Sequence, residues 1–189
     1  LVIATNRNDV LHRMLTTGTY ARQPIETSLS PSMDISISSN FERLLFDLYD
    51  GDASQIGQLM ADFSKGEINL TDSALARAQK LFTSAKVSDE ETLEEIRLAW
   101  QKTGQLLDPH TAIGTCAARL CASDGEGPMV TLSTAHPAKF PAAVARAGTG
   151  QTPLLPDHLA DLFDREERFD TMDNDIATVH AFMAAQCRR

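Results

Sequence analysis

An apolar run, a polar turn and the start of a helix follow one another between Met129 and Ala147, and this order constrains the fold more than any other feature. The run Met129–Leu132 predicts a short strand, and the end of the stretch predicts a helix. In open α/β sheets, ligands bind at the carboxyl ends of strands, where turns of this kind lie. The turn carries hydroxyl, imidazole and ammonium groups, so it is a candidate binding site. An ordinary strand-to-helix turn, capped by Ser133 or His136, is the alternative.

Candidate strands are few in the rest of the chain. Leu1–Ala4 has the apolar character of a buried strand, and Ser84–Val87 is another candidate. A parallel strand needs neighbours on both sides, so three short strands do not make a well-covered sheet alone. We therefore expect an α/β fold that is mostly helical with few parallel strands, part of whose sheet lies outside this sequence. By length the chain is one domain, residues 1–189, with a helical insert at about 50–105.

Capping residues mark the helix boundaries. Ser88 with Glu91 predicts a capping box, and Asp108 with Pro109 predicts an N-cap followed by a favoured first residue. Gly104 predicts a helix end. Further helices are expected to start at Asn8 or Asp9, Ser39, Asp52, Thr71 and Asp173.

Composition and charge exclude several classes of function. The hydrophobic content of 42% and the charged content of 23% are typical of a globular domain. The net charge of -9 argues against binding to nucleic acid or to anionic membrane surfaces, because both require a basic face. No apolar run approaches the ~20 residues that span a bilayer, and no signal peptide is visible.

The cysteines and histidines do not predict a metal site. Cys116 and Cys121 share one apolar helix face and are expected in the core, while Cys187 lies near the terminus. No pair of histidines has metal-ligand spacing. An odd number of cysteines without a secretion signal predicts a reducing, cytoplasmic location.

Two further places leave a functional and a structural interpretation open. The stretch Ser30–Ser39 is rich in hydroxyls and precedes a helix, so it is either a wall of a pocket for an anion or a loop that caps its helix. His110 lies in the first turn of a capped helix, where it either faces a cleft or packs and hydrogen-bonds locally.

Four segments, taken together, carry a resemblance to a known family. They are Ala4–Asp9, Leu29–Arg43, Leu107–Gly114 and Ser133–Phe140. In this order and with similar gaps, they resemble threonine synthase of the bacterial and fungal type. The resemblance covers residues 1 to about 147 and is weaker in the tail.

The resemblance implies pyridoxal-phosphate fold type II, the fold of the tryptophan synthase β-subunit, with pyridoxal 5'-phosphate as cofactor. The family is a carbon-oxygen lyase that converts O-phosphohomoserine and water to L-threonine and phosphate. Its Schiff-base lysine lies in a Phe-Lys-Asp-Phe segment and its phosphate loop is Ser-Gly-Asn-Phe-Gly, and neither segment occurs here. The resemblance thus implies a carboxyl-terminal portion of the catalytic domain, inactive alone, whose partner is the missing amino-terminal part of the same enzyme.

Thr134 is the residue to which the resemblance assigns a cofactor contact. In this fold a neutral hydroxyl hydrogen-bonds the pyridine nitrogen of the cofactor and leaves that nitrogen largely unprotonated. Ser133 is the neighbouring alternative and would face the opposite side of a continued strand. The possible substrate cleft comprises Asn6, Asn8, Asp9, His110, Thr111, Ser133, His136 and Lys139.

Lys139 is expected to support the turn or to meet an anion, because the family carries its cofactor on the lysine of the segment that this sequence lacks. Two alternative functions stay open. One is a related phospho-lyase that acts on another phosphorylated amino compound. The other is a helical interaction module without chemistry of its own, which the absent lysine favours.

Overall fold

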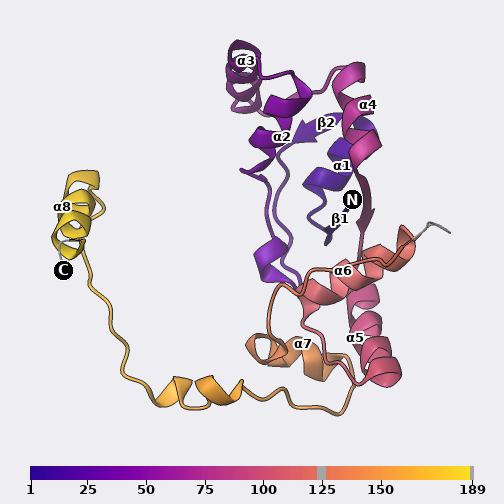
Figure 1. Ribbon diagram of the computed structural model, residues 1–189, viewed down its shortest axis with the longest axis vertical. Coiled ribbons are helices and arrows are strands. Elements are labelled where there is room, and N and C mark those ends of the chain that lie inside the picture. The colour runs from indigo at the N-terminus through magenta and orange to yellow at the C-terminus, as the bar shows by residue number, and fades with distance from the viewer. Residues whose placement is uncertain (123–126, 188–189) are drawn as a thin grey trace. The chain divides into compact units, whose positions relative to one another are not determined.

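The structure is a computed structural model that describes residues 1–122 and 127–187. The chain forms two compact units, Leu1–Leu154 and Leu155–Arg189. The first contains the strands β1 (Val2–Thr5), β2 (Thr19–Ala21), β3 (Glu67–Asn69) and β4 (Thr83–Lys86), and the helices α1 (Val10–Thr17), α2 (Phe41–Leu48), α3 (Ala53–Phe63), α4 (Asp72–Leu81), α5 (Asp89–Thr103), α6 (Pro109–Leu120) and α7 (Pro141–Arg146) (Figure 1). It also contains the short 3-10 turns η1 (Pro31–Met33) and η2 (Pro137–Lys139).

The strands form two separate pairs. β1 and β4 are parallel, with Val2 opposite Thr83, and they confirm the strands predicted at Leu1–Ala4 and Ser84–Val87 to within one residue. β2 and β3 are antiparallel, with Tyr20 opposite Ile68, and neither strand was predicted from the sequence. Both are three residues long, too short for an alternating pattern to be distinguished from coil.

Helices α1 and α6 cover opposite faces of the β1–β4 pair. Ile3 packs against the cluster that contains the buried α1 residue Met14, whereas Val2 and Ala4 pack against the cluster of α6. This division follows from the alternation of side chains along a strand. Helix α5 lies against α6, and Figure 1 shows both below β1 in that view.

The larger core lies among α1, α2, α3, α4 and the β2–β3 pair. Its central residues include Met14, Leu45 and Ala78, each 0% exposed. Tyr20 of β2 stacks on Phe63 of α3 with ring centroids 4.5 Å apart, and this contact packs α3 against the β2–β3 pair.

Most predicted helix ends are confirmed. Asp52 and Thr71 accept hydrogen bonds as N-caps, the Ser88–Glu91 capping box is formed, and Gly104 ends α5 in the left-handed conformation. Two starts differ from the prediction. Helix α2 has Asn40 rather than Ser39 at its N-cap, and Asp175 rather than Asp173 caps the last helix.

The predicted strand at Met129–Leu132 is wrong. The structure describes these residues as neither helix nor strand, and Val130 and Leu132 are 79% and 77% exposed. An apolar run becomes a strand only where another strand supplies hydrogen-bond partners, and this segment pairs with neither β1 nor β4 in the described chain.

The second unit contains two 3-10 turns, η3 (Asp157–Leu159) and η4 (Leu162–Asp164), and the helix α8 (Ile176–Gln186). The Asp175 side chain accepts a hydrogen bond from the Thr178 N–H at 2.8 Å, which fixes the start of α8. Among the described helices of the protein, none is long and apolar enough to cross a membrane.

Candidate functional site

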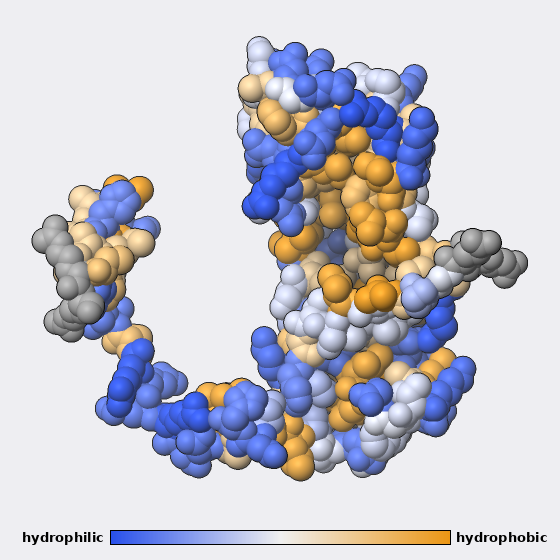
Figure 2. All heavy atoms as spheres, in the orientation of Figure 1, coloured by the Kyte–Doolittle hydropathy of each residue, from blue (hydrophilic) through white to orange (hydrophobic). Residues whose placement is uncertain are grey.

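A cavity of about 920 Å³ lies between β1, the η1 turn, α6 and residues 128–135. Its lining residues are Leu1, Val2, Ala4, Ser32, Met33, His110, Gly114, Ala118, Pro128, Met129, Val130, Thr131, Leu132, Thr134, Ala135 and Lys139. Figure 2 shows hydrophobic residues gathered over this part of the unit, between α4 and α6. We call this space the main cavity. Its size and its mainly apolar walls with few polar groups are typical of a cofactor pocket.

A second cavity, of about 430 Å³, lies on the other side of the 133–137 bend. Thr111, Ser133 and His136 contribute to its lining, together with the segment Gln151–Leu154. Thr134 therefore lines the main cavity while its neighbour Ser133 lines the second one.

The start of α6 is organised by Asp108, which is 1% exposed. Its carboxylate accepts the His110 N–H at 2.9 Å and the Thr111 N–H at 3.3 Å, so the predicted N-cap is confirmed. The same carboxylate also accepts the His110 Nδ1–H at 2.8 Å and the Thr111 hydroxyl. Pro109 occupies the first helical position, where no N–H is required.

His110 lines the main cavity but both of its ring nitrogens are already engaged. Nδ1 is 2.8 Å from Asp108, and Nε2 accepts the backbone N–H of Ser32 at 3.2 Å. The ring packs against Phe140 with a centroid separation of 4.6 Å. Both interpretations of the sequence therefore hold in part, because His110 borders the cavity and is also held by local hydrogen bonds.

A hydrogen bond to α6 fixes the bend that follows residue 132. The Thr134 N–H donates to the Thr111 hydroxyl oxygen at 3.1 Å, while the Thr134 residue itself is exposed at the cavity. His136 accepts the Ala138 N–H at 3.2 Å and caps η2, as the structural alternative predicted. Lys139 also lines the main cavity, with its ammonium 5.8 Å from the centre of the Phe140 ring.

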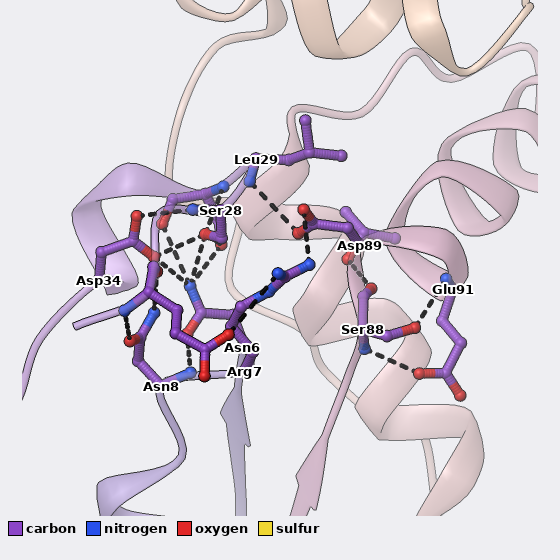
Figure 3. Close-up of polar contacts among 12 residues, drawn as sticks. Asn6, Arg7, Asn8, Ser28, Leu29, Asp34, Ser88, Asp89 and Glu91 are labelled. Carbon is purple, nitrogen blue, oxygen red and sulfur yellow. Dashed lines mark hydrogen bonds and ion pairs between the residues drawn. The ribbon is translucent and has the colours of Figure 1, made fainter. Parts of the chain in front are cut away.

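Asn6 and Asn8 lie in a polar network with the loop before η1 (Figure 3). The Asn6 amide nitrogen is 2.8 Å from Ser28 Oγ and 2.7 Å from Asp34 Oδ1, and its oxygen accepts the Asn8 N–H at 2.9 Å. Arg7 pairs with Asp89 at 2.9 Å beside this network. The two asparagines thus use their amide groups to hold the loop against the end of β1.

Asp9 forms ion pairs with Arg13 at 2.8 Å and with Lys86 at 3.0 Å. Burial alone would raise the pKa of Asp9, but hydrogen bonds and charge from Lys86 and Arg13 outweigh it and hold the pKa below its ordinary value. Asp9 joins α1 to β4 in this way. Among the described residues that line the main cavity and the second cavity, Asn6, Asn8 and Asp9 do not occur.

Three further residues line the main cavity that were not named individually from the sequence. Met33 and Ser32 lie in the hydroxyl-rich stretch for which a pocket wall was one of two interpretations. Gly114 allows residue 131 to approach α6, because a Cβ at Gly114 would lie 2.9 Å from Thr131 Cγ2. A glycine inside an otherwise regular helix was the available signal. No cluster of potential metal ligands occurs among the described residues.

The family model described as "Threonine synthase, C-terminal" matches residues 111–183. Threonine synthase of Pseudomonas aeruginosa is 51% identical over the whole of this chain, and that of Saccharomyces cerevisiae is 41% identical over 86% of it. The chain is homologous to the carboxyl-terminal part of threonine synthase. It spans 40% and 36% of the length of these two threonine synthases.

Solved structures agree with the sequence matches. The crystal structure of threonine synthase from Brucella melitensis with bound pyridoxal phosphate superposes on the whole chain with a TM-score of 0.88 and 43% identity. The chain covers 40% of that threonine synthase. The predicted fold class, pyridoxal-phosphate fold type II, is therefore confirmed.

Proposed function

We propose that this chain forms one side of the active site of a threonine synthase, which converts O-phosphohomoserine and water to L-threonine and phosphate. The observation that carries the proposal is that Thr134 lines a cavity of about 920 Å³ in a chain homologous to threonine synthases. The amino-terminal part of such an enzyme would supply the other side of the site and the lysine that carries the cofactor. A cytoplasmic location of the protein is part of the same proposal.

The residues around the main cavity are suited to pyridoxal phosphate. Apolar side chains such as Val2 and Met33 offer surfaces for a planar ring, and the Thr134 hydroxyl is a neutral hydrogen-bond partner for the ring nitrogen. When bound, the cofactor withdraws electrons from the amino-acid carbons and so permits proton removal there. A hydroxyl at the ring nitrogen leaves that nitrogen largely unprotonated, which limits this withdrawal.

Lys139 serves as a cation at the cavity rather than as the attachment point of the cofactor. It is exposed and lies over the Phe140 ring, whereas a lysine that forms a Schiff base is typically desolvated to lower its pKa. An anionic group of the substrate is the ligand that its charge favours. His110 does not act as a base in this proposal, because both ring nitrogens hold hydrogen bonds.

The activity is tested in the complete reading frame to which this chain belongs. Purified protein loaded with pyridoxal phosphate is expected to release phosphate from O-phosphohomoserine and to form threonine. If a folded, cofactor-loaded enzyme releases phosphate only from another phosphorylated amino compound, the related phospho-lyase is the correct function. If it takes up no cofactor, the helical interaction module is favoured instead.

The role of Thr134 is tested by Thr134→Val, with Ser133→Ala as the matched control from the second cavity. Loss of one hydrogen bond of about 0.5–1.5 kcal/mol lowers turnover by roughly two- to tenfold with little change in folding. Ser133→Ala is expected to retain wild-type turnover. If the control loses activity and Thr134→Val does not, the neighbouring hydroxyl is the cofactor contact.

A further inference from the structure

One buried carboxylate connects two walls of the main cavity. Asp108 accepts the ring Nδ1–H of His110 and the hydroxyl of Thr111 in addition to its helix-capping bonds. From these two residues, separate hydrogen bonds run to the η1 turn and to the 133–137 bend. Ser32 and Thr134, the residues at their ends, both line the main cavity and lie about a hundred positions apart in the sequence.

The charge of Asp108 determines the direction of both hydrogen-bond chains. An ionised carboxylate only accepts hydrogen bonds. The single hydroxyl hydrogen of Thr111 is therefore used at Asp108, and its oxygen keeps only lone pairs for the Thr134 N–H. In the same way Nδ1 of His110 must carry the hydrogen, so that Nε2 is the acceptor for the Ser32 N–H.

We propose that Asp108 is a positioning residue for the cofactor cavity, which acts through Thr111 on the bend of Thr134 and through His110 on the wall at Ser32. This inference rests on the proposed function, since it specifies how the cofactor cavity keeps its shape. Burial strengthens these hydrogen bonds, because Asp108, His110 and Thr111 are only 1%, 7% and 5% exposed.

The two histidines near the bend provide a test that needs neither cofactor nor activity. His110 must carry its hydrogen on Nδ1, whereas His136 accepts the Ala138 N–H at Nδ1 and must carry its hydrogen on Nε2. Nitrogen-15 NMR of the protein at a pH where both rings are neutral is expected to show opposite tautomers. The Nε2–H tautomer at His110 would overturn the proposed direction of the hydrogen bonds.

Thr111→Val tests the connection to the bend, because valine keeps the shape of threonine and removes its hydroxyl. Thr115→Val is the matched control, since the Thr115 hydroxyl bonds the Ala112 carbonyl one turn further along α6. Thr111→Ser retains the hydroxyl and should restore wild-type behaviour. In the cofactor-loaded enzyme, Thr111→Val is expected to speed amide hydrogen exchange at Thr134 roughly tenfold.

The same variant is expected to weaken the affinity for pyridoxal phosphate by about three- to tenfold, measured by absorbance titration, while both other variants leave it unchanged. Unchanged exchange at Thr134 would show that the hydrogen bond does not hold the bend. Faster exchange with unchanged cofactor affinity would overturn the positioning role. If even the wild-type enzyme takes up no cofactor, the proposed function fails, while the exchange and tautomer results still decide whether Asp108 organises the two walls.

Discussion

The two halves of the larger unit differ in how much polar burial accompanies their apolar packing. The half formed by α1–α4 with β2 and β3 buries an apolar cluster, with residues such as Met14 and Leu45 fully excluded from water. The half around the main cavity also buries apolar clusters, around Ile113 and Ile96, but it buries in addition polar side chains such as those of Asn6, Asp108 and His110. Apolar burial is non-directional and stabilises the packing of helices, whereas hydrogen bonds specify direction and fix irregular segments. The cavity walls are mostly irregular segments, so their shape depends on the second kind of force.

The largest expected effect is a loss of stability that leaves the shape of the main cavity unchanged. Leu45→Ala removes a fully buried side chain from the apolar half and should lower the free energy of unfolding by about 2–5 kcal/mol. Its neighbour Phe46, which is 43% exposed, gives the control Phe46→Ala, with an expected loss below about 1 kcal/mol. Denaturant unfolding measures both values.

Under conditions where the Leu45→Ala protein is folded, its affinity for pyridoxal phosphate should equal that of the wild type. A large loss of affinity in that variant would mean that the apolar half also sets the shape of the cavity. The distinction between the two halves would then be wrong.

An intermediate effect is expected at Gly114. Alanine gains about 0.5–1 kcal/mol of helix stability, but its Cβ would lie 2.9 Å from Thr131 Cγ2 and would push the cavity wall away. We expect Gly114→Ala to change stability by less than about 1 kcal/mol and to weaken cofactor binding. The added change Thr131→Ser removes the contacting methyl group and should restore binding.

Gly57→Ala is the control for this prediction, because a Cβ at Gly57 of α3 meets no atom within 4 Å. It should stabilise the protein by about 0.5–1 kcal/mol and leave cofactor binding unchanged. If the Gly114→Ala and Gly57→Ala proteins bind the cofactor equally well, the cavity wall at Thr131 moves without affecting cofactor binding.

The smallest expected effect is a change in the melting temperature with pH. Because the pKa of Asp9 is lowered in the folded protein, its ion pairs with Arg13 and Lys86 contribute stability above the ordinary value of 3.8 and lose it as the pH falls through the lowered pKa. Asp9→Asn should therefore lower the melting temperature at pH 6, and its difference from the wild type should shrink below about pH 3.8.

The pair formed by Asp62 and Lys65 is the comparison for Asp9. The hydrogen bond from Lys65 lowers the pKa of Asp62, but this pair is on the surface of α3. Solvent screens exposed pairs, so Asp62→Asn should shift the melting temperature less than Asp9→Asn at every pH. A larger shift at Asp62 would contradict the importance of the contact between α1 and β4.

Local signals in the sequence were sufficient for much of the fold. Caps such as Asp52, the Ser88–Glu91 box and Asp108 act through residues two or three positions away, so a linear sequence contains the whole interaction. The pairing of β2 with β3 joins residues almost fifty positions apart and has no such signal. The run at Met129–Leu132 has the composition of a strand, but pairing depends on a partner elsewhere.

The candidate site was predictable to a similar degree. The polar bend and the first turn of α6 were identifiable from their residue types, and both border the main cavity. The wall at Met33 was identifiable only as one of two interpretations of the stretch Ser30–Ser39, because an irregular loop is positioned by distant contacts such as the bond from Ser32 to His110. The placement of Asn6 and Asn8 near the substrate stays a prediction, and the sequence alone did not reveal that Asp34 would engage both of their amides.

The opposite placement of Ser133 and Thr134 makes two adjacent alcohols non-equivalent, because each residue borders a different space. The Thr134 N–H is anchored to the Thr111 hydroxyl, so the position along the chain, and not the mere presence of an alcohol nearby, determines which of the two residues borders the main cavity. A molecule in either space would therefore meet one of these alcohols and not the other.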